Sequence, residues 1–341
     1  MLLCLTLKDN MSFDNLKNIK IERLNLAVLI LFTFLSLVFA AFIPFFGIIG
    51  IALVPIPATL LVLCGRIRDG IICAVIACLI LIYPDYILAP VAAVLIIAVS
   101  LIYRNSIGKD KSKLFTIGSI FLIFCGVVLL YIALATAVSK DNFVSELFKN
   151  YNAYIDGIPN SGFITGYAGL LQVEQSQFDA ILKQTQNILR FFPYITPGFL
   201  IVSFAFISVI NYLATCAVLK RYNIYIKPFL SFKEWELPWY YCWGAILGLI
   251  LVLIPFGGQN LNKIADIIGF NLVIIFGFLY LVLGVSVLWG ILERFKVAFL
   301  WRICIFIILG LVFGLSILIL PFLGLIDIWI NFRRIKRSQP V

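Results

Sequence analysis

The sequence predicts an all-α fold, a polytopic transmembrane helical bundle of about eight to ten spans with one external amphipathic helix. The first supporting observation is composition, because 63% of the 341 residues are hydrophobic and 12% are charged. The second is the length of the apolar runs, which continue unbroken where strands of a membrane barrel would be short and alternating. The third is the placing of basic residues in short clusters between those runs.

Composition also excludes several classes of function. A mean hydropathy of +1.11 is too high for a water-exposed surface, so the lipid bilayer is the expected surrounding. The net charge of +10 does not indicate nucleic-acid binding, because the basic residues do not form one patch. The chain has no histidine, and its eight cysteines form no Cys-x-x-Cys pair. We therefore expect no metal, no cofactor and no catalytic residues, and the sequence predicts that the chain is not an enzyme.

The apolar runs give the predicted spans in chain order. These are residues 24–42, 44–64, 70–83, 86–103, 114–138, 193–219, 239–256, 264–290 and 298–331. Prolines explain the breaks between the early spans, since Pro44, Pro55 and Pro57 interrupt the second run and Pro84 forms the turn between the third and fourth.

Five segments follow from these spans. They are a cytoplasmic N-terminal segment at 1–23, a bundle of five spans at 24–138, an external segment at 139–191, a second bundle at 192–332 and a basic cytoplasmic tail at 333–341. The external segment is expected to be loop-like over 141–169 and an amphipathic helix over 170–190. Its apolar face carries Leu171, Phe178, Ile181, Leu182, Ile188 and Leu189.

The basic clusters predict the orientation. With a cytoplasmic N-terminus, nearly all of them fall on the inner side, as expected for a bacterial inner membrane protein. The last stretch conflicts with this pattern, because one span over 298–331 would place the tail outside. Its 34 residues exceed the roughly 20 that one span needs, so we favour a hairpin that turns near Gly314 or Pro321, or a half-buried return.

Polar residues within apolar runs are the candidates for ligand binding, because they are costly at membrane depth. The candidates are Asn211, Asn271, Asp327 and Arg333. The alternative for Asp327 is a structural ion pair with Arg333 or Arg334, which follow within one to two helical turns. Arg302 is expected to extend toward the headgroups.

Small residues and aromatic residues predict contacts. The pairs Gly244 with Gly248 and Gly310 with Gly314 have the spacing at which helix backbones approach closely. The aromatic residues at 235–243 are typical of the membrane interface at the start of a span.

Several of these segments carry a resemblance. The C-terminal run Gly324 to Arg333 resembles the closing signature of the YybS-like family of bacterial multi-pass membrane proteins of unknown function, and the likeness extends to Asn211-Tyr212 and to Pro228-Phe229 with Trp235. The N-terminal half is distantly similar to the S components of energy-coupling factor transporters, which bind a vitamin near the outer face. This resemblance implies a fold and no activity.

Two functions remain open on the sequence. The first is small-molecule binding or transport, S-component-like, with a pocket on the outer side covered by residues 139–191. The second is a non-transporting membrane scaffold in envelope biogenesis or cell division. The expected partners are the lipid bilayer, a small-molecule ligand and other membrane proteins, and no nucleic acid.

Overall fold

A computed structural model describes residues 25–42, 47–83, 85–139, 142–158, 175–221, 231–255 and 258–335. Every regular element within these ranges is helical, which confirms the all-α prediction. The predicted segment 1–23, the Pro44 and Pro84 turns, residues 159–169 of the loop-like part of the external segment and the end of the basic tail lie outside the described residues.

The chain forms two compact units that do not follow the order of the sequence. The first contains residues 1–149 and 203–229, and the second contains 150–202 and 230–341. Two described helices cross the boundary. Helix α8 (Phe143–Gly157) crosses it after Lys149, and α10 (Gln175–Arg221) contributes its N-terminal part to the second unit and the part from Ser203 onward to the first. At these two places the unit boundary therefore lies within a helix.

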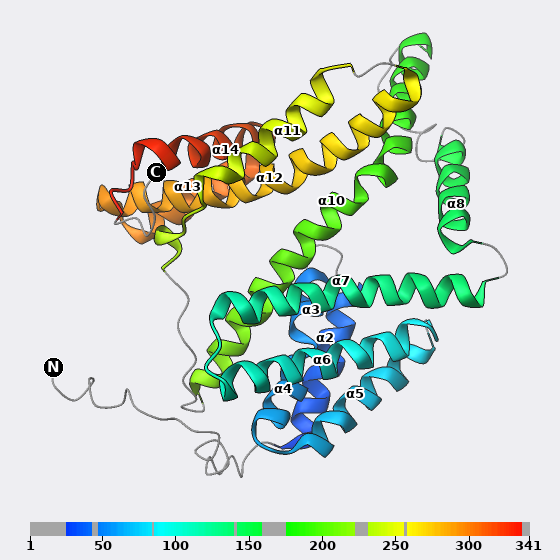
Figure 1. The fold of residues 1–341 in the computed structure, drawn as a ribbon, viewed down its shortest axis with the longest axis vertical. Coiled ribbons are helices and arrows are strands. Elements are labelled where there is room, and N and C mark those ends of the chain that lie inside the picture. The colour runs from blue at the N-terminus through cyan, green and yellow to red at the C-terminus, as the bar shows by residue number, and fades with distance from the viewer. Residues whose placement is uncertain are drawn as a thin grey trace. The chain divides into compact units, whose positions relative to one another are not determined.

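Within the described residues, the first unit contains six whole helices, the start of α8 and the end of α10. The whole helices are α2 (Leu26–Phe42), α3 (Gly47–Leu53), α4 (Ile56–Leu63), α5 (Ile67–Ile82), α6 (Leu88–Gly108) and α7 (Lys113–Val138). The predicted second span is broken at Pro55, where α3 ends and α4 begins. Every residue of α4 is buried, and α4 contacts α5 and α6, beside which it lies in Figure 1. This short helix is the centre of the first unit.

Asp85 organises the turn between α5 and α6. Its Oδ1 accepts hydrogen bonds from the amides of Ile87 and Leu88, and its Oδ2 accepts one from the Tyr131 hydroxyl at 2.8 Å. Burial raises the pKa of this carboxyl, but the hydrogen bonds from Tyr131, Leu88 and Ile87 outweigh burial and hold the pKa below its ordinary value. The carboxylate thus caps α6 and ties the turn to α7.

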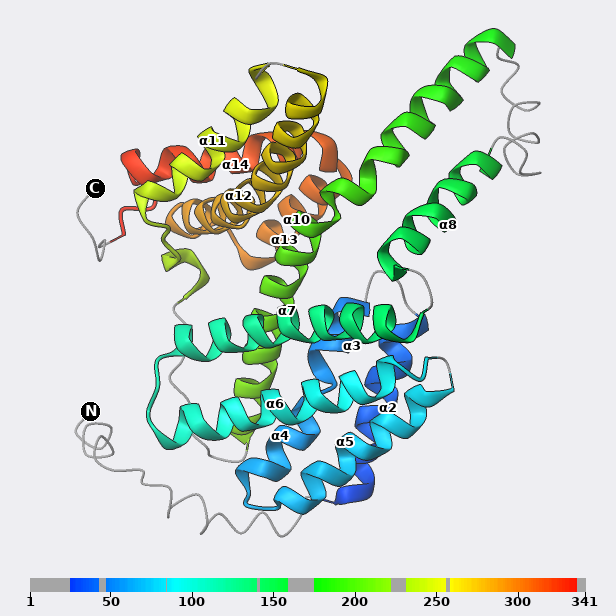
Figure 2. The ribbon, with the colours of Figure 1, turned by 45° about the vertical axis from the view of Figure 1, so that its right-hand side comes forward.

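The second unit contains the C-terminal helices. They are α11 (Cys242–Leu253), α12 (Gln259–Arg294), α13 (Phe299–Leu311) and α14 (Phe313–Ile330), preceded by the 3₁₀ turns η2 (Phe232–Glu234) and η3 (Trp239–Tyr241). Helix α12 packs against both α11 and α14, and the three lie side by side in Figures 1 and 2.

Glycines set the closest contacts of this unit. A side chain at Gly284 would meet the backbone carbonyl of Leu320, and one at Gly324 would meet the carbonyl of Tyr280, so α12 and α14 cross with their backbones nearly touching. Gly248 belongs to a predicted pair and does pack against α12, where a side chain would lie 3.0 Å from Val273 N. The predicted contact at Gly310 and Gly314 is wrong within the described residues, because a side chain at either would meet no atom within 4 Å.

In the part of the chain that the structure describes, four helices are long and apolar enough to cross a membrane: α6, α7, α10 and α12. The last apolar stretch forms a fifth candidate, made of α13 and α14 with a bend of 119° between them. The break lies at Val312, next to the predicted turn at Gly314. Shorter apolar helices cover 26–40, 47–63 and 239–253. The total of about eight to ten spans stays a prediction.

The segment after α7 differs from the sequence prediction. Residues expected to be a loop form α8 (Phe143–Gly157), whose apolar residues Phe143, Leu147, Tyr151 and Ile155 recur at helical spacing. The predicted separate helices at 170–190 and 193–219 are one helix of 47 residues, α10, about 70 Å long. Pro193 and Pro197 lie inside α10 without ending it, and side chains from other helices bond backbone groups of α10 beside both prolines.

Candidate functional site

Asn211 lies in the core of the first unit and is fully buried. Its Oδ1 accepts a hydrogen bond from the Tyr103 hydroxyl at 2.9 Å, and its Nδ2 donates to the Ala52 carbonyl at 2.7 Å. The amide therefore joins α6 and α10 to the end of α3. Its described bonds are all internal to the protein, as is common for buried amides.

Asn271 of α12 performs a similar task in the second unit. Its Nδ2 donates to the Tyr194 carbonyl at 2.8 Å, and its Oδ1 accepts from the Gly198 amide at 2.5 Å. In an undisturbed helix residues 194 and 198 are direct hydrogen-bond partners. Asn271 thus bridges α10 beside Pro197. One turn earlier, the Leu189 carbonyl, which Pro193 leaves without a helix donor, accepts from the Tyr151 hydroxyl at 3.0 Å.

Asp327 and Arg333 form the ion pair that the sequence suggested as the alternative to a ligand site. Arg333 donates to Asp327 Oδ2 from Nε at 3.1 Å and from Nη2 at 2.8 Å. The two side chains are 2% and 3% exposed, respectively. A pair this deeply buried contributes most to the stability of the fold when further hydrogen bonds satisfy both charged groups.

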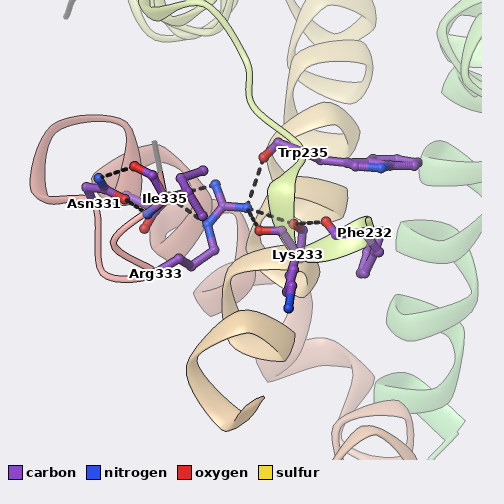
Figure 3. Close-up of polar contacts among 8 residues, drawn as sticks. Phe232, Lys233, Trp235, Asn331, Arg333 and Ile335 are labelled. Atoms are coloured by element: carbon purple, nitrogen blue, oxygen red, sulfur yellow. Dashed lines mark hydrogen bonds and ion pairs between the residues drawn. The ribbon is translucent and has the colours of Figure 1, made fainter. Parts of the chain in front are cut away.

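The end of α14 has the geometry that brings Arg333 back to Asp327. Asn331 ends the helix in the left-handed conformation with φ 53°, which asparagine tolerates well. Its side chain donates to the Ile335 carbonyl and accepts from the Ile335 amide, both at 3.0 Å (Figure 3). This closed turn places the Arg333 side chain against α14 and α12.

Arg333 also holds the irregular segment before α11. Its Nη1 donates to the carbonyls of Lys233 at 2.7 Å and Trp235 at 2.9 Å (Figure 3), and lies 3.0 Å from the Ser286 hydroxyl. Ser286 in turn donates to the Phe232 carbonyl at 2.6 Å. Non-helical backbone at a membrane interface needs such donors, and here one guanidinium and one hydroxyl supply them.

A cavity of about 220 Å³ opens beside this network. It is lined by Lys233, Glu234, Gly290, Glu293, Arg294, Arg333 and Ile335. Gly290 makes room for Arg333, because a side chain there would lie 2.9 Å from its Cδ. The cavity is smaller than the roughly 300–1,000 Å³ of pockets for drug-sized ligands. It suits a small charged group.

Glu293 connects the cations around the cavity. Its Oε1 lies 2.5 Å from Lys233 Nζ, and its Oε2 lies 3.7 Å from Arg302 Nη1. The hydrogen bond to Glu293 raises the pKa of Lys233 above its ordinary value. Arg302 does not simply extend to the headgroups, since it also stacks over the Trp289 ring and donates to the Val297 carbonyl.

The structure brings together only two of the four candidate residues. Asp327 and Arg333 belong to the hydrogen-bond network beside the cavity. Asn211 and Asn271 each take part in a different hydrogen-bond network. The cavity lies at residues that the sequence assigned to cytoplasmic loops, and not beneath 139–191. The sequence analysis did not identify Ser286 or Glu293 as members of the site. Ser286 could have been found, because it is a polar residue within an apolar run. Among the described residues, no group of three His, Cys, Asp or Glu side chains is placed to hold a metal.

Comparison with known proteins adds one finding. Neither the curated proteins nor the solved structures contain a match to this chain. One family model, described as predicted membrane protein (DUF2232), matches residues 30–328, which include Asn211, Asn271 and Asp327. The chain therefore belongs to this family of membrane proteins, DUF2232.

Proposed function

We propose that this membrane protein binds a small molecule that carries an anionic group, and that the cavity beside Arg333 is the place of binding. The observation that carries the proposal is the lining, in which three cations, Lys233, Arg294 and Arg333, outnumber two carboxylates, Glu234 and Glu293. Arg333 is fixed by five hydrogen-bond contacts, so its charge is positioned before a ligand arrives. We extend the proposal to a transport-related role on the resemblance of the N-terminal half to S components, which concerns the first unit and not this cavity.

The test is a thermal-unfolding screen of the purified full chain against small phosphates, sulfate, and mono- and dicarboxylates. At least one class is expected to raise the melting temperature, and Arg294→Gln is expected to reduce that rise. Arg68→Gln, which removes an exposed cation of the first unit, is the matched control. If no anion shifts the melting temperature while a fixed partner protein co-purifies, the non-transporting scaffold replaces this proposal.

We further propose the bacterial inner membrane as the location, with a cytoplasmic N-terminus. The distribution of basic residues supports this orientation. A reporter fused after Val341 should give a cytoplasmic signal, and a periplasmic signal would refute the hairpin over 298–331.

A further inference from the structure

The Glu293 carboxylate occupies the position that an anionic ligand would take. It lies between the Lys233 ammonium, which reaches it from η2, and the Arg302 guanidinium, which reaches it from α13. Lys233 and Glu293 are each 37% exposed, so their ion pair is in contact with solvent. Exposed pairs of this kind contribute little and exchange readily. An incoming anion with more oxygens can therefore replace Glu293 at low cost.

The donors around the cavity outnumber the oxygens of one carboxylate. Lys233 and Arg294 line the cavity, and Arg302 lies on the other side of Glu293, 3.7 Å from its Oε2. Arg294 uses one described bond, from Nη1 to the Phe332 carbonyl at 3.0 Å. A carboxylate offers two oxygens, whereas a phosphate ester offers up to three and matches guanidinium geometry. Arg333 remains bound to Asp327 and to the backbone, and acts as the fixed wall of the site.

The aromatic residues of the same unit indicate the depth of the cavity. Trp239, Tyr240 and Trp329 are about half exposed, and the Trp235 carbonyl accepts from Arg333. Exposed tryptophan and tyrosine lie at the level of lipid headgroups, where phosphates are concentrated. Basic pockets between helices at this level bind the headgroups of anionic lipids.

We propose that the cavity binds a phosphate ester. Lys233 and Arg294, which line the cavity, are its first ligands, and Arg302 is reached when the phosphate displaces Glu293. The inference rests on the proposed binding function and specifies its ligand class. Glu293 then acts as a competitor that occupies the empty site. Removing its charge strengthens binding, whereas a purely structural Glu293 would give the opposite result or none.

The experiment measures binding to the full chain in nanodiscs and in detergent. One arm compares nanodiscs of phosphatidylcholine with nanodiscs that contain phosphatidic acid, using native mass spectrometry to count retained lipids. The second arm titrates inorganic phosphate against the chain in detergent. Glu293→Gln is expected to tighten binding about fivefold and Lys233→Gln to weaken it about fivefold, with Arg68→Gln unchanged.

The outcomes separate the sources and the two proposals. Retention of phosphatidic acid alone supports a lipid headgroup, and saturable binding of inorganic phosphate alone supports a free phosphate. Tighter binding by Glu293→Gln cannot arise from misfolding, so it supports the site directly. If Glu293→Gln binds neither phosphatidic acid nor inorganic phosphate more tightly than the natural chain, the inference is overturned. If a carboxylate binds and phosphate does not, the inference fails and the proposed function stands, whereas failure of every anion overturns both.

Discussion

The pair of Asp327 and Arg333 allows the sharpest test of the fold. Both side chains are almost wholly buried, and Arg333 also donates hydrogen bonds to the carbonyls of Lys233 and Trp235. Asp327→Asn leaves a buried guanidinium without its counter-charge, and such losses cost about 3–5 kcal/mol. Arg333→Met should cost at least as much, because it also leaves two carbonyls without donors, at about 1–3 kcal/mol each.

The double variant separates the pair from the rest of the network. Asp327→Asn with Arg333→Met should cost less than the sum of the single variants, by about 0.5–3 kcal/mol, because the second change removes a charge that the first left unpaired. Reversible unfolding of the purified chain in mixed micelles of increasing sodium dodecyl sulfate measures these free energies. Arg334→Met, at the exposed neighbouring position, is the control and should stay within about 0.5 kcal/mol. Additive single costs, or a cost below about 1 kcal/mol for Asp327→Asn, would refute the reasoning.

Four further substitutions test separate features. Gly284→Ala should destabilise the chain by about 1–3 kcal/mol, because the methyl group meets the opposite backbone. Gly310→Ala, in open space, should stabilise by up to about 1 kcal/mol in the same unfolding assay. Asn271→Ala should cost about 1–3 kcal/mol by removing the partners of two backbone groups of α10, whereas exposed Asn187→Ala should not, and equal losses would contradict the bridge. The pKa of Asp85 is lowered in the folded chain, so its carboxylate stabilises the fold above the unfolded pKa of about 3.9. This stabilisation is lost as the pH falls through the folded pKa. The melting-temperature difference between the natural chain and Asp85→Asn should therefore be constant above about pH 5 and shrink below about pH 4.

Helix ends and breaks were partly predictable from local chemistry. Proline at 55 predicted the break between α3 and α4, because proline lacks the amide that would continue the ladder. The same logic failed at Pro193 and Pro197, where α10 continues. Tyr151 and Asn271 bond α10 at these prolines, and both are distant in sequence. A rule that considers only neighbours along the chain does not include such partners.

Close helix contacts show the same division. The spacing of Gly244 and Gly248 predicted a contact that exists, while the identical spacing of Gly310 and Gly314 predicted one that the described residues lack. The tightest crossing pairs Gly284 of α12 with Gly324 of α14, which form no motif in the sequence. Spacing along one helix shows that an approach is possible, and only the position of the second helix decides whether it occurs.

The sequence by itself determined the solvent and the fold class. Long apolar runs leave lipid as the surrounding, and lipid requires backbone groups to be satisfied within helices. The sequence also indicated the pairing of Asp327 with Arg333, because the two residues are only six positions apart in the chain. Only the tertiary structure brought Lys233, Ser286, Glu293 and Arg302 to that pair and formed a cavity beside it. These residues lie on different elements, and their convergence depends on helix packing, which local patterns do not encode.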